Sequence, residues 1–174
     1  SQALAVYAQA LAAYEAAGSR VGIANVQLNL AQLEISLGRM HHAQDLLTKA
    51  VQTCQEIGSG RIEAMARANH GVVLVELGQH QEAYDTALEA LRLARISGEH
   101  RTEGWAHHSA QQAAAGLGRF ADALAHAQAA VVQFAAHNDP NTARIDASAA
   151  IRHLHALGRH ADALAAADAL LTEI

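Results

Sequence analysis

The heptapeptide LGRMHHA at residues 37–43 returns as LGQHQEA at 77–83, LGRFADA at 117–123 and LGRHADA at 157–163. The spacing between successive copies is 40 residues each time, with no insertion or deletion. A fixed period of this length is typical of a protein built by stacking one supersecondary unit many times. The repeat, rather than any single motif, therefore decides the fold.

A second column with the same period marks where helices end. Gly18, Gly58 and Gly98 are followed in register by Asn138. Glycine, and after it asparagine, tolerates the left-handed backbone conformation that commonly terminates a helix. The Leu-Gly pair of each heptapeptide ends another helix inside the unit. Each unit is therefore predicted to be two helices joined by a tight turn.

The predicted fold is an all-α array of such helical hairpins. First helices are expected at 21–37, 61–77, 101–117 and 140–157. Second helices are expected at 1–17, 40–57, 80–97, 120–137 and 160–173. We divide this single array into a partial unit at 1–20, repeats at 21–60, 61–100 and 101–140, and a truncated repeat at 141–174.

The composition agrees with a helical array and excludes other fold classes. The 174 residues include 43 alanines and one proline, and aromatic residues make up 3% of the chain. Alanine is the strongest helix former, whereas an all-β fold needs β-branched and aromatic residues. The 51% apolar fraction argues against disorder. No apolar run reaches the roughly 18 residues that a membrane span requires.

Charge and cysteine content narrow the classes of function. The net charge is −5 with neutral histidines, and the basic residues are scattered along the chain. Nucleic-acid-binding domains usually carry a basic stripe, so we expect no direct contact with nucleic acid. The single cysteine, Cys54, excludes an internal disulfide and agrees with a reducing compartment. We expect a cytoplasmic protein that does not contact a membrane.

The sequence contains no catalytic or cofactor-binding pattern. Its glycines punctuate helices, and neither a phosphate-binding loop nor an HExxH motif occurs. Adjacent helical residues point about 100° apart, so His41-His42 and His107-His108 are not same-face chelating pairs. A histidine cluster formed by side chains from different repeats is still possible. We expect no enzymatic activity, no cofactor and no metal site, and we expect Cys54 to be a buried structural thiol.

The helical unit resembles the tetratricopeptide repeat. The resemblance rests on a turn glycine followed by alanines five and twelve residues later, as in Gly38, Ala43 and Ala50, and it covers essentially the whole chain. Two features depart from the family pattern. The unit has 40 residues instead of 34, and a column of large consensus side chains holds Met40, His80, Phe120 and His160. The longer unit is similar to arrays in kinesin light chains and in bacterial regulators.

The resemblance implies a right-handed superhelix whose first helices line a concave groove for a partner peptide. The residues expected to contact the peptide are Leu28, Asn29, Gln32, Ser36, Asn69, Val72, Glu76, His108, Gln112 and Arg152. Asn29 and Asn69 share one column, and they either hold a peptide backbone or bond within the array. The two main groove columns are residues 28, 68, 108 and 148 and, one helical turn later, residues 32, 72, 112 and 152. These columns contain neither Lys nor Asn, so we do not expect the carboxylate clamp that some family members carry.

These observations predict a non-enzymatic module that binds a protein or peptide, as part of a larger bacterial protein. One alternative is a structural or oligomerisation segment, in which apolar array ends such as Leu164 and Leu171 form a homodimer. Another is the sensor arm of a bacterial transcriptional or STAND-type ATPase regulator. The chain begins at Ser1 without an initiator Met, and we expect it to be a fragment of a longer array.

Overall fold

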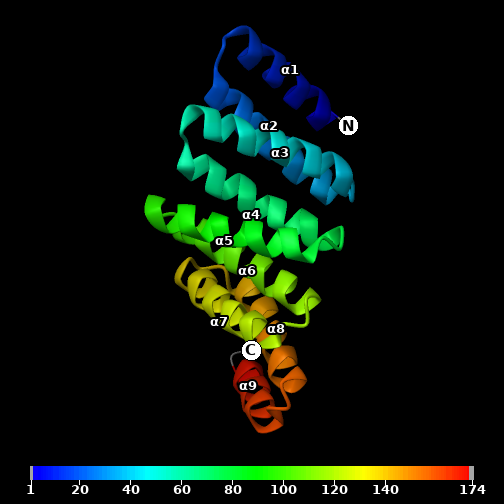
Figure 1. The fold of residues 1–174 in the computed structure, drawn as a ribbon, viewed down its shortest axis with the longest axis vertical. Coiled ribbons are helices and arrows are strands. Elements are labelled where there is room, and N and C mark those ends of the chain that lie inside the picture. Colours follow the sequence, from blue (N-terminus) through cyan, green and yellow to red (C-terminus); the bar gives the residue numbers. More distant parts are fainter. Residues whose placement is uncertain (1, 173–174) are drawn as a thin grey trace.

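The computed structural model describes residues 2–172, and this part of the chain folds into nine helices without any strand (Figure 1). The helices are α1 (Gln2–Ala16), α2 (Arg20–Ser36), α3 (Met40–Ile57), α4 (Gly60–Glu76), α5 (His80–Ser97), α6 (His100–Gly116), α7 (Phe120–Ala136), α8 (Pro140–Ala156) and α9 (His160–Thr172). The all-α prediction is confirmed. The even-numbered helices are the predicted first helices, and the odd-numbered ones are the second helices.

The observed helix bounds differ from the predicted ones by at most one residue within the described range. Four first helices end one residue early because the leucine before each turn glycine, such as Leu37, is the C-cap residue. The fourth first helix begins at Pro140 as expected, and the Asp139 side chain accepts a hydrogen bond from the Thr142 N–H at 3.2 Å. Positions 1 and 173 of the predicted helices lie outside the described residues.

The helix ends have the backbone conformation that the Gly/Asn column requires. Gly58 follows α3 with a φ of 69°, and Asn138 follows α7 with a φ of 55°. In both turns the next N–H donates back to a carbonyl of the last helical turn, from Ser59 to Cys54 at 2.9 Å and from Asp139 to Phe134 at 3.0 Å. Asparagine therefore replaces glycine at the position where a left-handed residue closes the helix.

The helices follow one another along the long axis in chain order, from α1 at one end to α9 at the other (Figure 1). Each helix packs on the next one, and α4 also packs on both α2 and α6. Three first helices consequently lie next to each other on one side of the stack. The assignment of repeats to residues 21–60, 61–100 and 101–140 stays a prediction.

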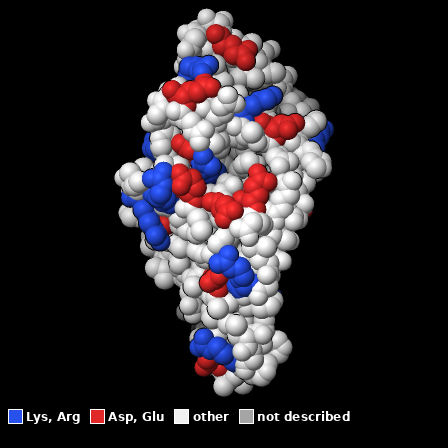
Figure 2. Space-filling model, in the orientation of Figure 1, with Lys and Arg blue, Asp and Glu red and all other residues white. Residues whose placement is uncertain are grey.

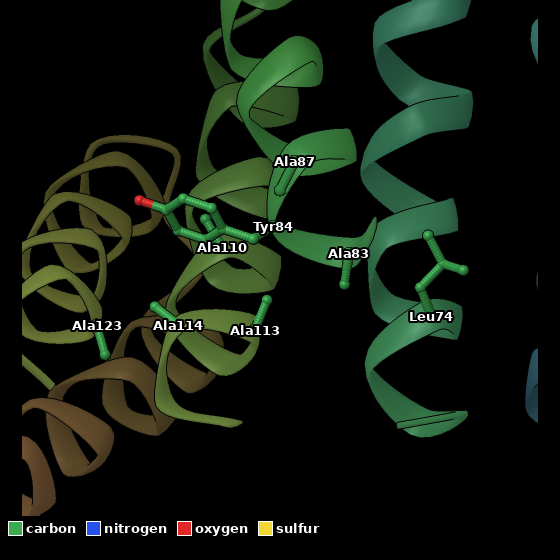
Figure 3. Close-up of a cluster of buried hydrophobic side chains, with 8 residues drawn as sticks. All are labelled: Leu74, Ala83, Tyr84, Ala87, Ala110, Ala113, Ala114 and Ala123. Carbon is green, nitrogen blue, oxygen red and sulfur yellow. The ribbon is translucent and has the colours of Figure 1, made fainter. Parts of the chain in front are cut away.

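Alanine side chains form most of the core between the helices. Figure 3 shows one cluster, in which Leu74 of α4 lies beside Ala83 and Tyr84 of α5 lies among alanines of α5 and α6, with Ala123 of α7 at its edge. Ala83 and Ala123, which belong to the 40-residue column, are fully buried. A methyl group lets two helix backbones approach closely, but it removes little apolar area from water. Stability therefore has to come from many stacked contacts.

A glycine makes the contact between α4 and α6 closer still. A Cβ atom at Gly71 would lie 2.2 Å from the Ser109 hydroxyl oxygen and 3.2 Å from the Ser109 Cβ. Ser109 is fully buried, and its hydroxyl has no hydrogen-bond partner in the described part of the chain. A side chain at position 71 would therefore displace Ser109 or separate the two helices.

We expect Gly71→Ala to lower the free energy of unfolding by about 1–2 kcal/mol, because overpacking outweighs the helix propensity that alanine adds. Urea denaturation followed by circular dichroism measures this change. Gly60→Ala is the matched control, since its nearest atom would be Leu93 Cδ2 at an ordinary 3.7 Å. The double variant Gly71→Ala/Ser109→Ala should recover part of the lost free energy of unfolding. Equal effects of the two glycine substitutions would contradict close packing at Gly71.

Candidate functional site

A pocket of about 490 Å³ lies between the first helices α2, α4 and α6. It is lined by Gln32 and Ile35 from α2, by Met65, Ala68, Asn69 and Val72 from α4, and by Arg101, Thr102 and Trp105 from α6. Its volume is within the range of about 300–1,000 Å³ that is usual for ligand-binding clefts. Because three consecutive hairpins contribute to it, the pocket exists only in the assembled stack.

Trp105 forms a fixed wall of this pocket. Its ring contacts the Phe134 ring edge-to-face at a centroid distance of 5.2 Å and the His108 imidazole at 5.5 Å. It also packs against the core cluster that contains Ala68 and against a second cluster that contains Ala143. The indole thus fills a gap between helices with one part of its surface and faces the pocket with another. Aromatic side chains held in this way are common anchors of interfaces.

Four polar side chains line the pocket without a partner inside the protein. Gln32, Asn69, Arg101 and Thr102 make no side-chain hydrogen bond or ion pair within residues 2–172. The internal bonding that the sequence left open for Asn69 is therefore not seen. An amide without a partner offers both a donor and an acceptor, which is what binding of a peptide backbone requires.

The structure brings three of the ten predicted contact residues into this pocket, namely Gln32, Asn69 and Val72. Gln32 and Val72 belong to the same predicted groove column, and both retain exposed surface. Asn69 lies on α4, three residues before Val72. These three residues support a contact surface across α2 and α4.

The other seven predicted residues lie elsewhere. Leu28 is 3% exposed in the core between α2, α3 and α4, and His108 is 8% exposed, so both have little surface for a partner. Gln112 bonds to the His108 imidazole at 3.1 Å. Arg152 lines a separate hollow between α8 and α9. The remaining three are exposed outside the pocket lining, and they are Asn29, Ser36 and Glu76.

Sequence reasoning did not place Arg101 or Met65 in the site, although the repeat contains a signal for them. Met65 and Trp105 occupy one column, three residues before the groove column of Ala68 and His108. Residues three apart on a helix share a face, as do residues four apart. The groove prediction considers only residues that are four apart on the same helix. Arg101 lies four residues before Trp105 and joins the same face.

The histidines on α6 point in different directions, as the sequence predicts. His107 faces α7, where its Nδ1 lies 2.9 Å from Nδ1 of His126. His108 faces α8, and its Nδ1 lies 2.9 Å and 3.1 Å from the two carboxylate oxygens of the fully buried Asp146. A second bridge between α6 and α8 joins Gln111 Oε1 to His153 Nε2 at 2.9 Å. These contacts connect helices.

The described residues contain no group of three or more His, Cys, Asp or Glu side chains that could hold a metal ion. Cys54 is fully buried, and burial, with a smaller contribution from Glu63, raises the pKa of its thiol to about 11. The buried structural thiol is therefore confirmed. Within the described helices, none is long and apolar enough to cross a membrane.

Burial, together with smaller contributions from the nearby His126 and Arg95, lowers the pKa of His107 to about 4 against an opposing contribution from Glu103. The unfolded chain regains the ordinary pKa of about 6.5. Between these values the unfolded state binds more protons than the folded state. The neutral imidazole thus contributes stability above about pH 6.5, and this contribution is lost as the pH falls toward 4.

We expect the free energy of unfolding to fall on acidification from pH 7.5 to 4.5, with His107 accounting for on the order of 2 kcal/mol. His107→Gln should reduce this fall in the free energy of unfolding, whatever its effect on stability at pH 7.5. Chemical denaturation at both pH values measures the difference, and His41→Gln on an exposed position is the control. An unchanged slope in His107→Gln would show that this histidine does not titrate with unfolding.

Comparison with known proteins gives a match at the level of structure. No family model matches this sequence, and no curated protein shows significant similarity to it. A putative kinesin light chain from Podosopora anserina with nearly identical TPR-like repeats superposes with a TM-score of 0.78. The sequences are 16% identical, and the match covers 98% of this chain and 84% of that one. The fold is that of tetratricopeptide-like repeat proteins.

Two further tetratricopeptide-like structures are larger than this chain. A Rap protein complexed with Competence and Sporulation Factor matches with a TM-score of 0.75 and 17% identity over 86% of this chain. A STAND protein with a tetratricopeptide repeat sensor from Pyrococcus horikoshii matches with a TM-score of 0.65 and 15% identity over 87% of this chain. This chain spans 42% of the Rap protein and 24% of the STAND protein. Identities this low establish the fold alone.

Proposed function

We propose that this chain is a non-enzymatic interaction module that binds an extended segment of a partner protein in the pocket between α2, α4 and α6. The observation that carries the proposal is the combination of a fixed apolar wall at Trp105 with the unpartnered amides of Gln32 and Asn69. The amides would bond the peptide backbone, and Val72 and Met65 would contact an apolar side chain. The Rap protein complexed with Competence and Sporulation Factor supports a binding role for this fold.

Trp105 makes this proposal measurable, because it is the single tryptophan of the chain and it lines the pocket. A random peptide library displayed on phage supplies ligands, and titration of the selected peptides against intrinsic fluorescence supplies their affinities. We expect Val72→Asp to weaken binding at least tenfold, or about 1.4 kcal/mol, because a charged side chain then replaces the apolar surface that Val72 offers the ligand.

Val132→Asp is the matched control for this experiment. Val132 is 65% exposed on α7, outside the pocket lining, so the same substitution there should leave the affinity unchanged. Circular dichroism verifies that both variants fold. A selected peptide that binds Val72→Asp and the unmodified chain equally well would place the binding surface elsewhere.

A second candidate function is that of a sensor arm in a larger bacterial cytoplasmic regulator. The STAND protein with a tetratricopeptide repeat sensor supports it, since this chain matches part of that protein. In such an arm the same pocket would receive the signal, and binding would change the curvature of the stack. Small-angle X-ray scattering with and without a selected peptide tests this, because a sensor requires a change in the scattering profile and a simple binding module does not.

Pairing of two copies through the last helix is a third candidate, supported by two exposed leucines on α9. Leu164 is 65% exposed and Leu171 is 67% exposed. Light scattering at increasing concentration measures this association, and a constant monomer mass would exclude it.

A further inference from the structure

Most arginines of this chain pair with a neighbouring carboxylate. Figure 2 shows Lys and Arg side chains next to Asp and Glu over much of the visible face. Eight of the 11 arginines lie within 4.0 Å of a carboxylate oxygen, and they are Arg20, Arg39, Arg61, Arg67, Arg92, Arg95, Arg119 and Arg159. Within the described residues, Arg101, Arg144 and Arg152 have no such partner.

Arg101 is the one of these three that lines the pocket between α2, α4 and α6, and no other charged residue of the described chain lines that pocket. It lies in the first turn of α6, four residues before Trp105, so both side chains are on one face of the helix. The pocket therefore combines a single positive charge with an aromatic wall.

The carboxylates nearest to Arg101 in sequence are already engaged by other side chains. Glu99 pairs with Arg61 on α4. Glu103 pairs with Arg95 at 2.9 Å, and its second oxygen lies 3.7 Å from the His100 imidazole. Arg101 has acidic neighbours on both sides along the chain and pairs with neither. Its guanidinium is therefore available to a group that enters the pocket.

We propose that the pocket selects peptide segments in which an aspartate or glutamate side chain lies next to a large apolar side chain. This inference rests on the proposed function and specifies its ligand. The carboxylate pairs with the planar guanidinium of Arg101, which matches its two oxygens in a bidentate geometry. The apolar side chain packs against Trp105, Met65 and Val72, and the peptide backbone bonds to Asn69.

The chemistry of the pocket lining favours a carboxylate over other groups. A basic ligand side chain would place two like charges together, and a neutral one would leave the guanidinium unpaired beside an apolar wall. The net charge of the whole chain is −5, so its long-range field does not attract an acidic segment. The preference for acid therefore comes from Arg101 itself, and a single substitution is expected to remove it.

The carboxylate is assigned to a side chain rather than to the end of a peptide. The pocket is lined by three successive first helices, so a segment that lies across α2 and α4 passes Arg101 at α6 with its side chains. Peptides with a free carboxyl terminus and their amidated forms distinguish the two sources. Amidation of the terminus is expected to leave the affinity unchanged.

The test uses a random dodecapeptide library displayed on phage, with four baits. The unmodified chain should enrich Asp or Glu next to Phe, Leu, Ile or Met. Arg101→Gln should lose the acidic preference and keep the apolar one, whereas Arg101→Glu should enrich Lys or Arg instead. Arg144→Gln is the matched control, because Arg144 is also unpaired but lies outside the pocket lining.

Synthetic peptides from the selection then provide a double-mutant cycle. We expect Arg101→Gln to weaken the binding of an acidic peptide about tenfold, which is the usual scale for a charge-assisted hydrogen bond in a half-enclosed site. Changing the peptide's Glu to Gln should weaken binding to the unmodified chain by a similar factor. The same peptide change should have little effect on Arg101→Gln, because each substitution removes the same contact.

The outcomes separate this inference from the proposed function. Peptides that require Val72 but show no acidic preference, or that bind Arg101→Gln unchanged, overturn the inference and leave the proposed function standing. Binding that amidation of the terminus abolishes also overturns it. If no peptide is enriched, or if Val72→Asp binds as well as the unmodified chain, the proposed function fails and the inference fails with it.

Discussion

Close contact between helices through alanine and glycine is the constraint on which the rest of this structure depends. Ala83 and Ala123 are fully buried at helix contacts, and Gly71 of α4 lies directly against Ser109 of α6. Each of these contacts removes little apolar area, so no hairpin is stabilised by its own core. The helices are instead stabilised by neighbours on both sides, and the surface of each first helix is shaped by the next one.

The contacts between first helices differ along the stack. In the first half, α4 packs directly on α2 and on α6, and the pocket lies between these three helices. Beyond α6, side-chain bridges join the first helices, from His108 to Asp146 and from Gln111 to His153. The fully buried Asp146 needs such a partner, because an uncompensated buried carboxylate is strongly destabilising. Trp105 lies between these two kinds of contact, which explains why its ring is held from several sides.

The pocket follows from this arrangement and not from any local motif. Its apolar wall belongs to the core, since Trp105 packs on Phe134, while its polar side chains have no internal partner. Gln32 and Arg101 are exposed and Asn69 is half-buried, so these side chains can exchange hydrogen bonds with water for hydrogen bonds with a ligand. A fold of this kind supports many functions, so the function is argued from these side chains and their chemistry. Their combination is suited to recognition of a peptide segment.

The sequence by itself determined the helical hairpins, their order and their ends, because these depend on local signals that recur every 40 residues. Gly58 and Asn138 end helices through backbone conformation, and Asp139 with Pro140 starts one through capping, so none of these needs a distant partner. The partners of the side chains were decided only by the tertiary structure. Of the residues in the predicted columns, Gln32, Asn69 and Val72 line the pocket, but the columns did not reveal that His108 is bonded to Asp146 or that Arg101 is left unpaired. Those facts depend on the distance and rotation between neighbouring hairpins, which the packing of small side chains sets and which a repeat period does not encode.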